Sequence, residues 1–175
     1  MKHARFDTKR AYELEQSIRE YTVGELDTMD SDEMIHSWHD YYHASNAWKY
    51  ALLLYIARVL KWDRTSNARL PEVTSLSRLL LDSVRSCRSV AALPKQLLFP
   101  VFLAGSESMD LYSRNFVKEY CEEWYRNCRY TMFVETLELL QEIWTQKDMR
   151  RNDFSVWWGS IIGKNQPRGS GFLFG

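Results

Sequence analysis

Several signals of common protein classes are absent from this sequence. Its three cysteines are an odd number and form no Cys-x-x-Cys pair, which argues against a disulfide framework and is typical of a reducing compartment. The nine residues at 97–105 carry no charged or polar side chain, but a bilayer span needs roughly 20 residues, so we expect no membrane span. Lys plus Arg and Asp plus Glu number 23 each. Because this balance leaves no net field to attract phosphate, we expect no direct nucleic-acid binding by this segment.

Strand-like alternation is weak throughout, and the sequence has no internal repeat or low-complexity tract. Apolar residues recur instead at helical spacing, and a chain of 175 residues suits one domain with a sizeable core. The sequence therefore predicts an all-α fold, a single irregular helical domain of about seven helices with a glycine-rich C-terminal tail. The expected helices are residues 8–21, 31–62, 73–87, a helix starting near residue 100, 113–128, 133–144 and 153–161.

The apolar run at 97–105 is the centre of the predicted core. Because proline lacks an amide hydrogen and disfavours helical geometry in the preceding residue, we expect a regular helix to start near Pro100. Two amphipathic helices follow, each with apolar residues at spacings of four, three and four. Asp110 and Ser113 are candidate caps for the first of them. These three helices are expected to form the main packing unit.

Three further segments carry simple expectations. Residues 51–57 of the second helix have no polar face, so we expect that part to be enclosed on nearly all sides. The polar segment 145–152 is expected to be a loop, with Asp153 as a cap for the short helix that follows. The tail at 163–175 holds four glycines and one proline, which excludes regular structure there.

Three stretches of the chain resemble the fungal-specific regulatory domain found downstream of zinc binuclear cluster DNA-binding domains. They are residues 97–107, 46–60 and 172–175. The first reads Leu-Leu-Phe-Pro-Val-Phe-Leu-Ala-Gly-Ser-Glu, similar to the family's aromatic-proline pair, apolar triplet, Ala-Gly and glutamate. Phe99 stands where the family has tryptophan, and Ser106 stands where cysteine is common. The resemblance implies that 1–175 is the C-terminal portion of this domain, with no DNA-binding module present.

This resemblance also implies a function. It implies an all-helical regulatory and effector segment of a fungal transcription factor, located in the nucleus or in nucleus and cytoplasm. Its partners would be transcriptional co-regulators or a homo-oligomer partner, and in some relatives the domain is a receptor for a sterol or another apolar metabolite. We therefore expect regulation through protein partners and an apolar ligand, with no catalytic residues and no cofactor.

Aromatic residues are unusually many: seven tryptophans, ten tyrosines and eight phenylalanines. They favour either a large aromatic core or a lined apolar pocket, and the sequence leaves both open. In the pocket interpretation, aromatics near the C-terminus close a ligand site against the long helix and the apolar run. The predicted ligand-binding residues are Leu52, Tyr55, Phe102, Trp157, Trp158 and Phe172.

The helix face from Glu33 to His43 supports an alternative, a small helical metal-dependent enzyme. His36, His39 and His43 lie at i, i+3 and i+7 on one face, and a Glu-x-x-His pair is typical of di-metal carboxylate bundles. Such bundles need a second Glu-x-x-His and further carboxylates on other helices, and the sequence has no second copy. We therefore predict no metal site. A stand-alone interaction module is the third alternative.

Overall fold

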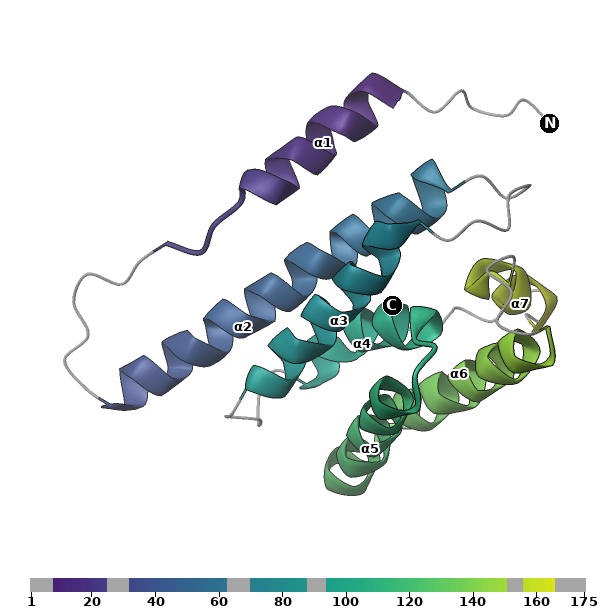
Figure 1. The fold of residues 1–175 in the computed structure, drawn as a ribbon. Helices are drawn as coiled ribbons and strands as arrows, with labels where there is room; N and C mark the ends of the chain where they lie inside the picture. Colours follow the sequence, from purple (N-terminus) through teal and green to yellow (C-terminus); the bar gives the residue numbers. More distant parts are fainter. Residues whose placement is uncertain (1–7, 25–31, 63–69, 88–93, 151–155, 166–175) are drawn as a thin grey trace.

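The computed structural model describes residues 8–24, 32–62, 70–87, 94–150 and 156–165 (Figure 1). Within these ranges the chain is helical and contains no strand, so the all-α prediction with seven helices is confirmed. The glycine-rich tail beyond residue 165 lies outside the described residues. The elements are α1 (Thr8–Glu20), α2 (Asp32–Tyr55), the π-helical segment η1 (Ile56–Lys61) that continues α2, α3 (Pro71–Ser86), α4 (Pro94–Glu107), α5 (Leu111–Cys128), α6 (Met132–Met149) and α7 (Trp158–Asn165).

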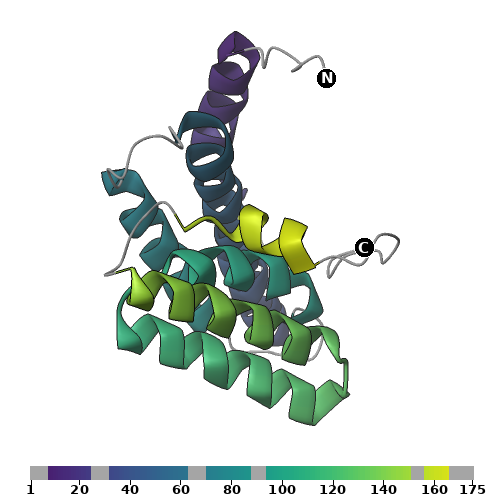
Figure 2. The ribbon, with the colours of Figure 1, turned by 90° about the vertical axis from the view of Figure 1, so that its right-hand side faces the viewer.

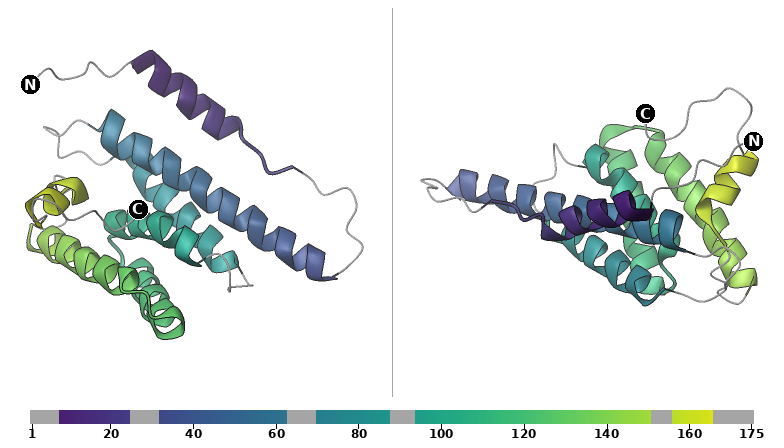
Figure 3. Two further views of the ribbon diagram at one scale, coloured as in Figure 1. Left: turned by 180° about the vertical axis from the view of Figure 1, so that it is seen from behind. Right: turned by 90° about the horizontal axis from the view of Figure 1, so that it is seen from above.

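The helices are arranged around α4, which contacts α2, α3, α5 and α6. The α5–α6 pair forms an antiparallel hairpin, and α7 returns along α6 (Figure 2). On the opposite side, α1 runs along α2 and away from the hairpin (Figures 1 and 3). Nine consecutive residues of the chain, 100–108, are buried. The apolar run therefore occupies the centre of the fold, as predicted.

The start of α4 differs from the prediction. The helix begins at Pro94, and Pro100 lies inside it. A proline in the first turn is compatible with a helix, because the first amides have no acceptor within the helix. Pro100 is the seventh residue of α4, so it removes the hydrogen bond to the carbonyl of Gln96 and its ring crowds that carbonyl. Gln96 is solvent-exposed, which allows water to bind its carbonyl instead, and the burial of Pro100 and the residues after it offsets the remaining cost.

The end of α6 also differs from the prediction, because the helix continues to Met149 through part of the expected loop. Lys147 looks like a loop residue in the sequence but is 1% exposed. Its ammonium donates to the carbonyl of Ser106 at 2.6 Å, so a partner on another helix permits its burial. The expected cap of the following helix, Asp153, lies outside the described residues.

Two further predictions concern the start of α5 and the end of α7. The side chain of Asp110 accepts a hydrogen bond from the amide of Ser113 at 2.8 Å, so Asp110 is the N-cap of α5. α7 continues to Asn165, so the expectation that regular structure ends at residue 163 was wrong by a few residues. Glycine inside a helix weakens it by only about 1 kcal/mol relative to alanine, which packing can offset.

Candidate functional site

Four of the six predicted ligand residues lie together where α2 ends. The ring of Trp158 lies 6.3 Å from that of Tyr55, 5.8 Å from that of Phe102 and 5.5 Å from that of Trp157, measured between centroids. Phe102 has no exposed surface. The rings fill the space between α2, α4 and the start of α7, and Phe172 lies outside the described residues. This arrangement is a packed aromatic cluster.

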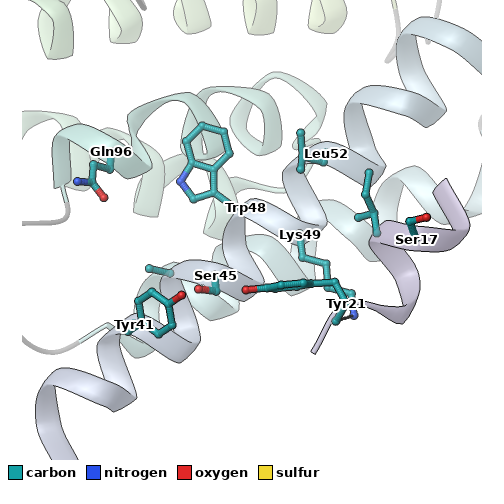
Figure 4. Close-up of a pocket in the computed structure, with 10 residues that line it drawn as sticks. Ser17, Tyr21, Tyr41, Ser45, Trp48, Lys49, Leu52 and Gln96 are labelled. Carbon is teal, nitrogen blue, oxygen red and sulfur yellow. Dashed lines mark hydrogen bonds between the residues drawn. The ribbon is translucent and has the colours of Figure 1, made fainter. Parts of the chain in front are cut away.

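Leu52 lies one helical turn before Tyr55 but faces a different environment. It is 43% exposed, and Tyr55 is 37% exposed. The expectation that residues 51–57 are enclosed on nearly all sides was therefore wrong at these two positions. The reason is tertiary: α1 covers only part of the outer face of α2 and leaves a groove beside Leu52 (Figure 4).

This groove has a volume of about 460 Å³ and lies between α1, α2 and the start of α4 (Figure 4). Along α2 its lining residues recur at helical spacing, with Tyr41, Trp48 and Leu52 all exposed. The ring of Trp48 lies 6.0 Å from that of Phe99, which anchors this side chain to α4. The lining residues are Ser17, Ile18, Tyr21, Tyr41, Ala44, Ser45, Trp48, Lys49, Leu52 and Gln96.

The polar groups of the groove are few. Lys49 Nζ donates to the backbone carbonyl of Tyr21 at 2.6 Å, immediately after the last residue of α1. Carbonyls at this end of a helix lack intrahelical partners and carry partial negative charge, so a lysine is favourable there. None of the described residues that line the groove is acidic. The groove therefore suits an apolar molecule with a hydrogen-bond acceptor near Lys49 or the tyrosine hydroxyls.

A neighbouring face of α1 is held by charged groups. Glu15 is 4% exposed, and its carboxylate lies 2.7 Å from Lys61 Nζ on η1. Within α1, Arg19 donates to the same carboxylate at 2.7 and 3.0 Å and reaches Glu72 of α3 at 3.2 Å. Burial alone would raise the pKa of Glu15, but the hydrogen bonds from Lys61 and Arg19 hold it below its ordinary value. We call these four residues the α1 ion cluster.

A second charged arrangement lies deep in the fold at the end of α4. Glu107 accepts a hydrogen bond from Arg58 Nε at 2.7 Å and lies 3.3 Å from Lys147 Nζ. The three side chains are 1–3% exposed. Arg58 also donates to the carbonyl of Val156 at 3.0 Å, which ties the π-helical segment to the chain before α7. We call Arg58, Glu107 and Lys147 the buried triad.

The last carbonyls of α4 receive donors from neighbouring helices. Ser77 Oγ donates to the carbonyl of Ala104 at 2.9 Å, and Trp144 Nε1 donates to that of Gly105 at 2.8 Å. Together with the Lys147 contact to Ser106, these bonds satisfy groups that a helix end leaves without partners. Sequence reasoning did not identify this network. The available signal was a charged residue directly after the long apolar run.

Arg114 of α5 extends this network to the surface. It donates to the carbonyl of Ser108 at 3.1 Å and to both carboxylate oxygens of Asp148 at 2.7 and 2.9 Å. The hydrogen bonds from Arg114 lower the pKa of Asp148 below its ordinary value. The arginine thereby connects the α4 end to α6.

The histidine-bearing part of α2 contains two ring pairs. His39 and His43 meet edge to face with ring centroids 4.4 Å apart, and Trp38 and Tyr42 are stacked with centroids 5.3 Å apart. In the described part of the chain, no group of three or more histidine, cysteine, aspartate or glutamate side chains is placed to hold a metal ion. The side chain of Glu33, on which the metal-enzyme alternative also relies, lies outside the described residues.

Comparison with known proteins gives one result. A family model described as the fungal specific transcription factor domain matches residues 2–174. Neither the curated proteins nor the solved structures provide a match. Among the described helices, none is both long enough and apolar enough to cross a membrane.

Proposed function

The chain belongs to the fungal specific transcription factor domain family, and we propose that an apolar molecule bound between α1 and α2 controls its regulatory activity. Membership of this family indicates a transcription-regulatory segment rather than an enzyme. In this proposal the segment works in the nucleus, through transcriptional co-regulators or a second copy of itself. Residues 1–175 would be the C-terminal portion of the regulatory domain.

The observation that carries the ligand proposal is the groove itself. Its volume of about 460 Å³ lies within the range of roughly 300–1,000 Å³ that is typical of small-molecule sites. Its lining is mostly apolar and aromatic, with a few polar groups that would orient a ligand. Tyr21, Tyr41 and Leu52 are each more than two-fifths exposed in the groove, and burying them under a ligand would remove apolar surface from water.

The aromatic cluster has a supporting role in this proposal. Leu52 lines the groove, and Tyr55, one turn further along α2, contacts Trp158. A ligand against Leu52 would therefore lie one helical turn from the rings that join α2 to α7. Of the predicted ligand residues, we place Leu52 in direct contact with the ligand. Tyr55, Phe102, Trp157 and Trp158 form the aromatic cluster next to Leu52 and do not contact the ligand in this proposal.

Titration with Nile red, an uncharged dye whose fluorescence rises in apolar surroundings, tests this proposal. We expect saturable binding at one dye per chain, lost in Leu52→Asp because a carboxylate in the groove would have to be desolvated. The matched control is Leu79→Asp on α3, where the leucine is 46% exposed and does not line the groove. It should bind the dye like the unmodified chain.

Two outcomes would contradict the proposed ligand-binding position. Loss of binding in Trp157→Ala but not in Leu52→Asp, with helical content unchanged by circular dichroism, would move the ligand to the aromatic cluster. Absence of saturable binding, both of the dye and of any component of a lipid extract, would remove the ligand from the proposed function.

A further inference from the structure

We propose that α1 is a ligand-dependent element: the apolar molecule completes the attachment of α1 to α2, and the α1 ion cluster sets how tightly that molecule binds. This inference rests on the proposed function, because it assigns a mode of regulation to the same groove. It concerns a part of the site remote from the ligand, since Glu15 does not line the groove.

The packing of α1 is the first observation. None of its described side chains is a buried apolar residue, and the one buried side chain is the charged Glu15. Ile18 is partly buried against the main core. Because apolar burial is the main drive for packing a helix on its neighbours, α1 is attached weakly in this respect. Its tertiary contacts depend on the α1 ion cluster and on the bond from Lys49 to Tyr21.

The exposed apolar side of α1 is the second observation. Leu14, on the same helix face as Ile18, is 54% exposed but does not line the groove. Tyr21, directly after the last residue of α1, is 48% exposed and lines the groove together with Ile18. Opposite them, Trp48 and Leu52 of α2 are 36% and 43% exposed. The two helices therefore present apolar surfaces toward one groove without closing it. A molecule seated there would contact both helices at once.

A thermodynamic consequence follows from this geometry. A ligand that contacts α1 and α2 together binds the docked arrangement better than an arrangement with α1 displaced, so it shifts the population toward docking. Because only the docked arrangement makes both sets of contacts, a change that lowers the docked population lowers the apparent affinity for the ligand in proportion to that population. Removing a charge interaction should therefore lower the affinity for an uncharged ligand that never touches the charge.

The test compares Nile red affinity in Glu15→Gln and Glu13→Gln. Both variants remove one carboxylate from α1, but Glu13 is exposed, and among the described residues its ion pair lies within α1, with Lys9 at 3.7 Å. We expect Glu15→Gln to raise the dissociation constant by up to about fivefold, the lower end of typical allosteric coupling, and Glu13→Gln to leave it unchanged. Lys61→Gln breaks the same contact from η1 and should have an effect of the same direction.

Hydrogen exchange of the unmodified chain gives a second readout that needs no variant. Saturating dye should slow amide exchange along α1 more than along α5, which does not line the groove. Unchanged exchange in α1 at saturation, or equal dye affinity in Glu15→Gln and Glu13→Gln, would overturn the coupling while leaving the ligand site in place. Failure of the unmodified chain to bind dye would instead remove the proposed function.

Discussion

Two glutamates of this protein, Glu107 and Glu15, each lie between two cationic side chains, yet they hold the fold in different ways. Glu107 and both of its partners are 1–3% exposed, and they join η1, α4 and α6. Glu15 is similarly buried, but Arg19 and Lys61 are each 41% exposed. Water therefore solvates the two cationic partners of Glu15, whereas it has little access to any member of the buried triad.

The difference shows that the surroundings, not the charge pattern, decide the role of an ion cluster. Charges inside a protein are costly to desolvate, so the three members of the buried triad depend on one another. Pairs with exposed members contribute little, because solvent competes for each partner. The first arrangement suits a permanent connection at the end of α4. The second suits an attachment of α1 that a ligand can strengthen.

The largest expected effect is in the buried triad. Glu107→Gln removes the carboxylate that lies between Arg58 and Lys147, and we expect a loss of about 3–5 kcal/mol in the free energy of unfolding. Chemical denaturation followed by circular dichroism measures it. Lys147→Met is the comparison, since it keeps the contact of Glu107 with Arg58 and fills a similar volume. We expect Lys147→Met to lower the free energy of unfolding by less than Glu107→Gln does. An equal or larger loss would show that the lysine, not the carboxylate, holds the α4 end.

A smaller effect is expected where α4 passes its neighbours most closely. A Cβ at Gly105 would lie 3.1 Å from Val117 Cγ1 and 3.2 Å from Leu140 Cδ1. We expect Gly105→Ala to lower the free energy of unfolding by about 1 kcal/mol, because overpacking outweighs the higher helix propensity of alanine. Gly24→Ala is the control, since nothing lies within 4 Å of its Cβ. An equally stable Gly105→Ala variant would mean that the two side chains adjust without cost.

The smallest expected effect is a weaker attachment of α1 at acidic pH. The pKa of Glu15 is lower in the folded chain than in the unfolded one, so the carboxylate contributes stability above the ordinary glutamate pKa of about 4.3. That contribution, below about 1 kcal/mol, is lost as the pH falls through the lowered pKa. Amide protection of α1 should fall over this range before that of α4, and Glu15→Gln should abolish the dependence. Simultaneous loss in both helices would contradict a separate attachment of α1.

The sequence carried enough information for the helices but not for all of their ends. Asp110 is a cap because its side chain reaches an amide three residues away, which is a local matter. Pro100 and Lys147 were misjudged because their surroundings are not local. The helical position of Pro100 depends on the surroundings of the start of α4. The burial of Lys147 depends on a carbonyl 41 residues away along the chain. For the candidate site, the aromatic cluster around Trp158 was largely anticipated, and the groove was not.

By itself the sequence determined the all-α class, the central apolar helix and the resemblance to a regulatory domain, because residue spacing and order are properties of the chain alone. Only the tertiary structure decided which side of each helix stays open. Tyr41, Trp48 and Leu52 follow the same helical spacing as core residues. They line a groove because Glu15, rather than an apolar residue, is the buried side chain of α1, and electrostatic attachment to Lys61 leaves the apolar side of that helix uncovered.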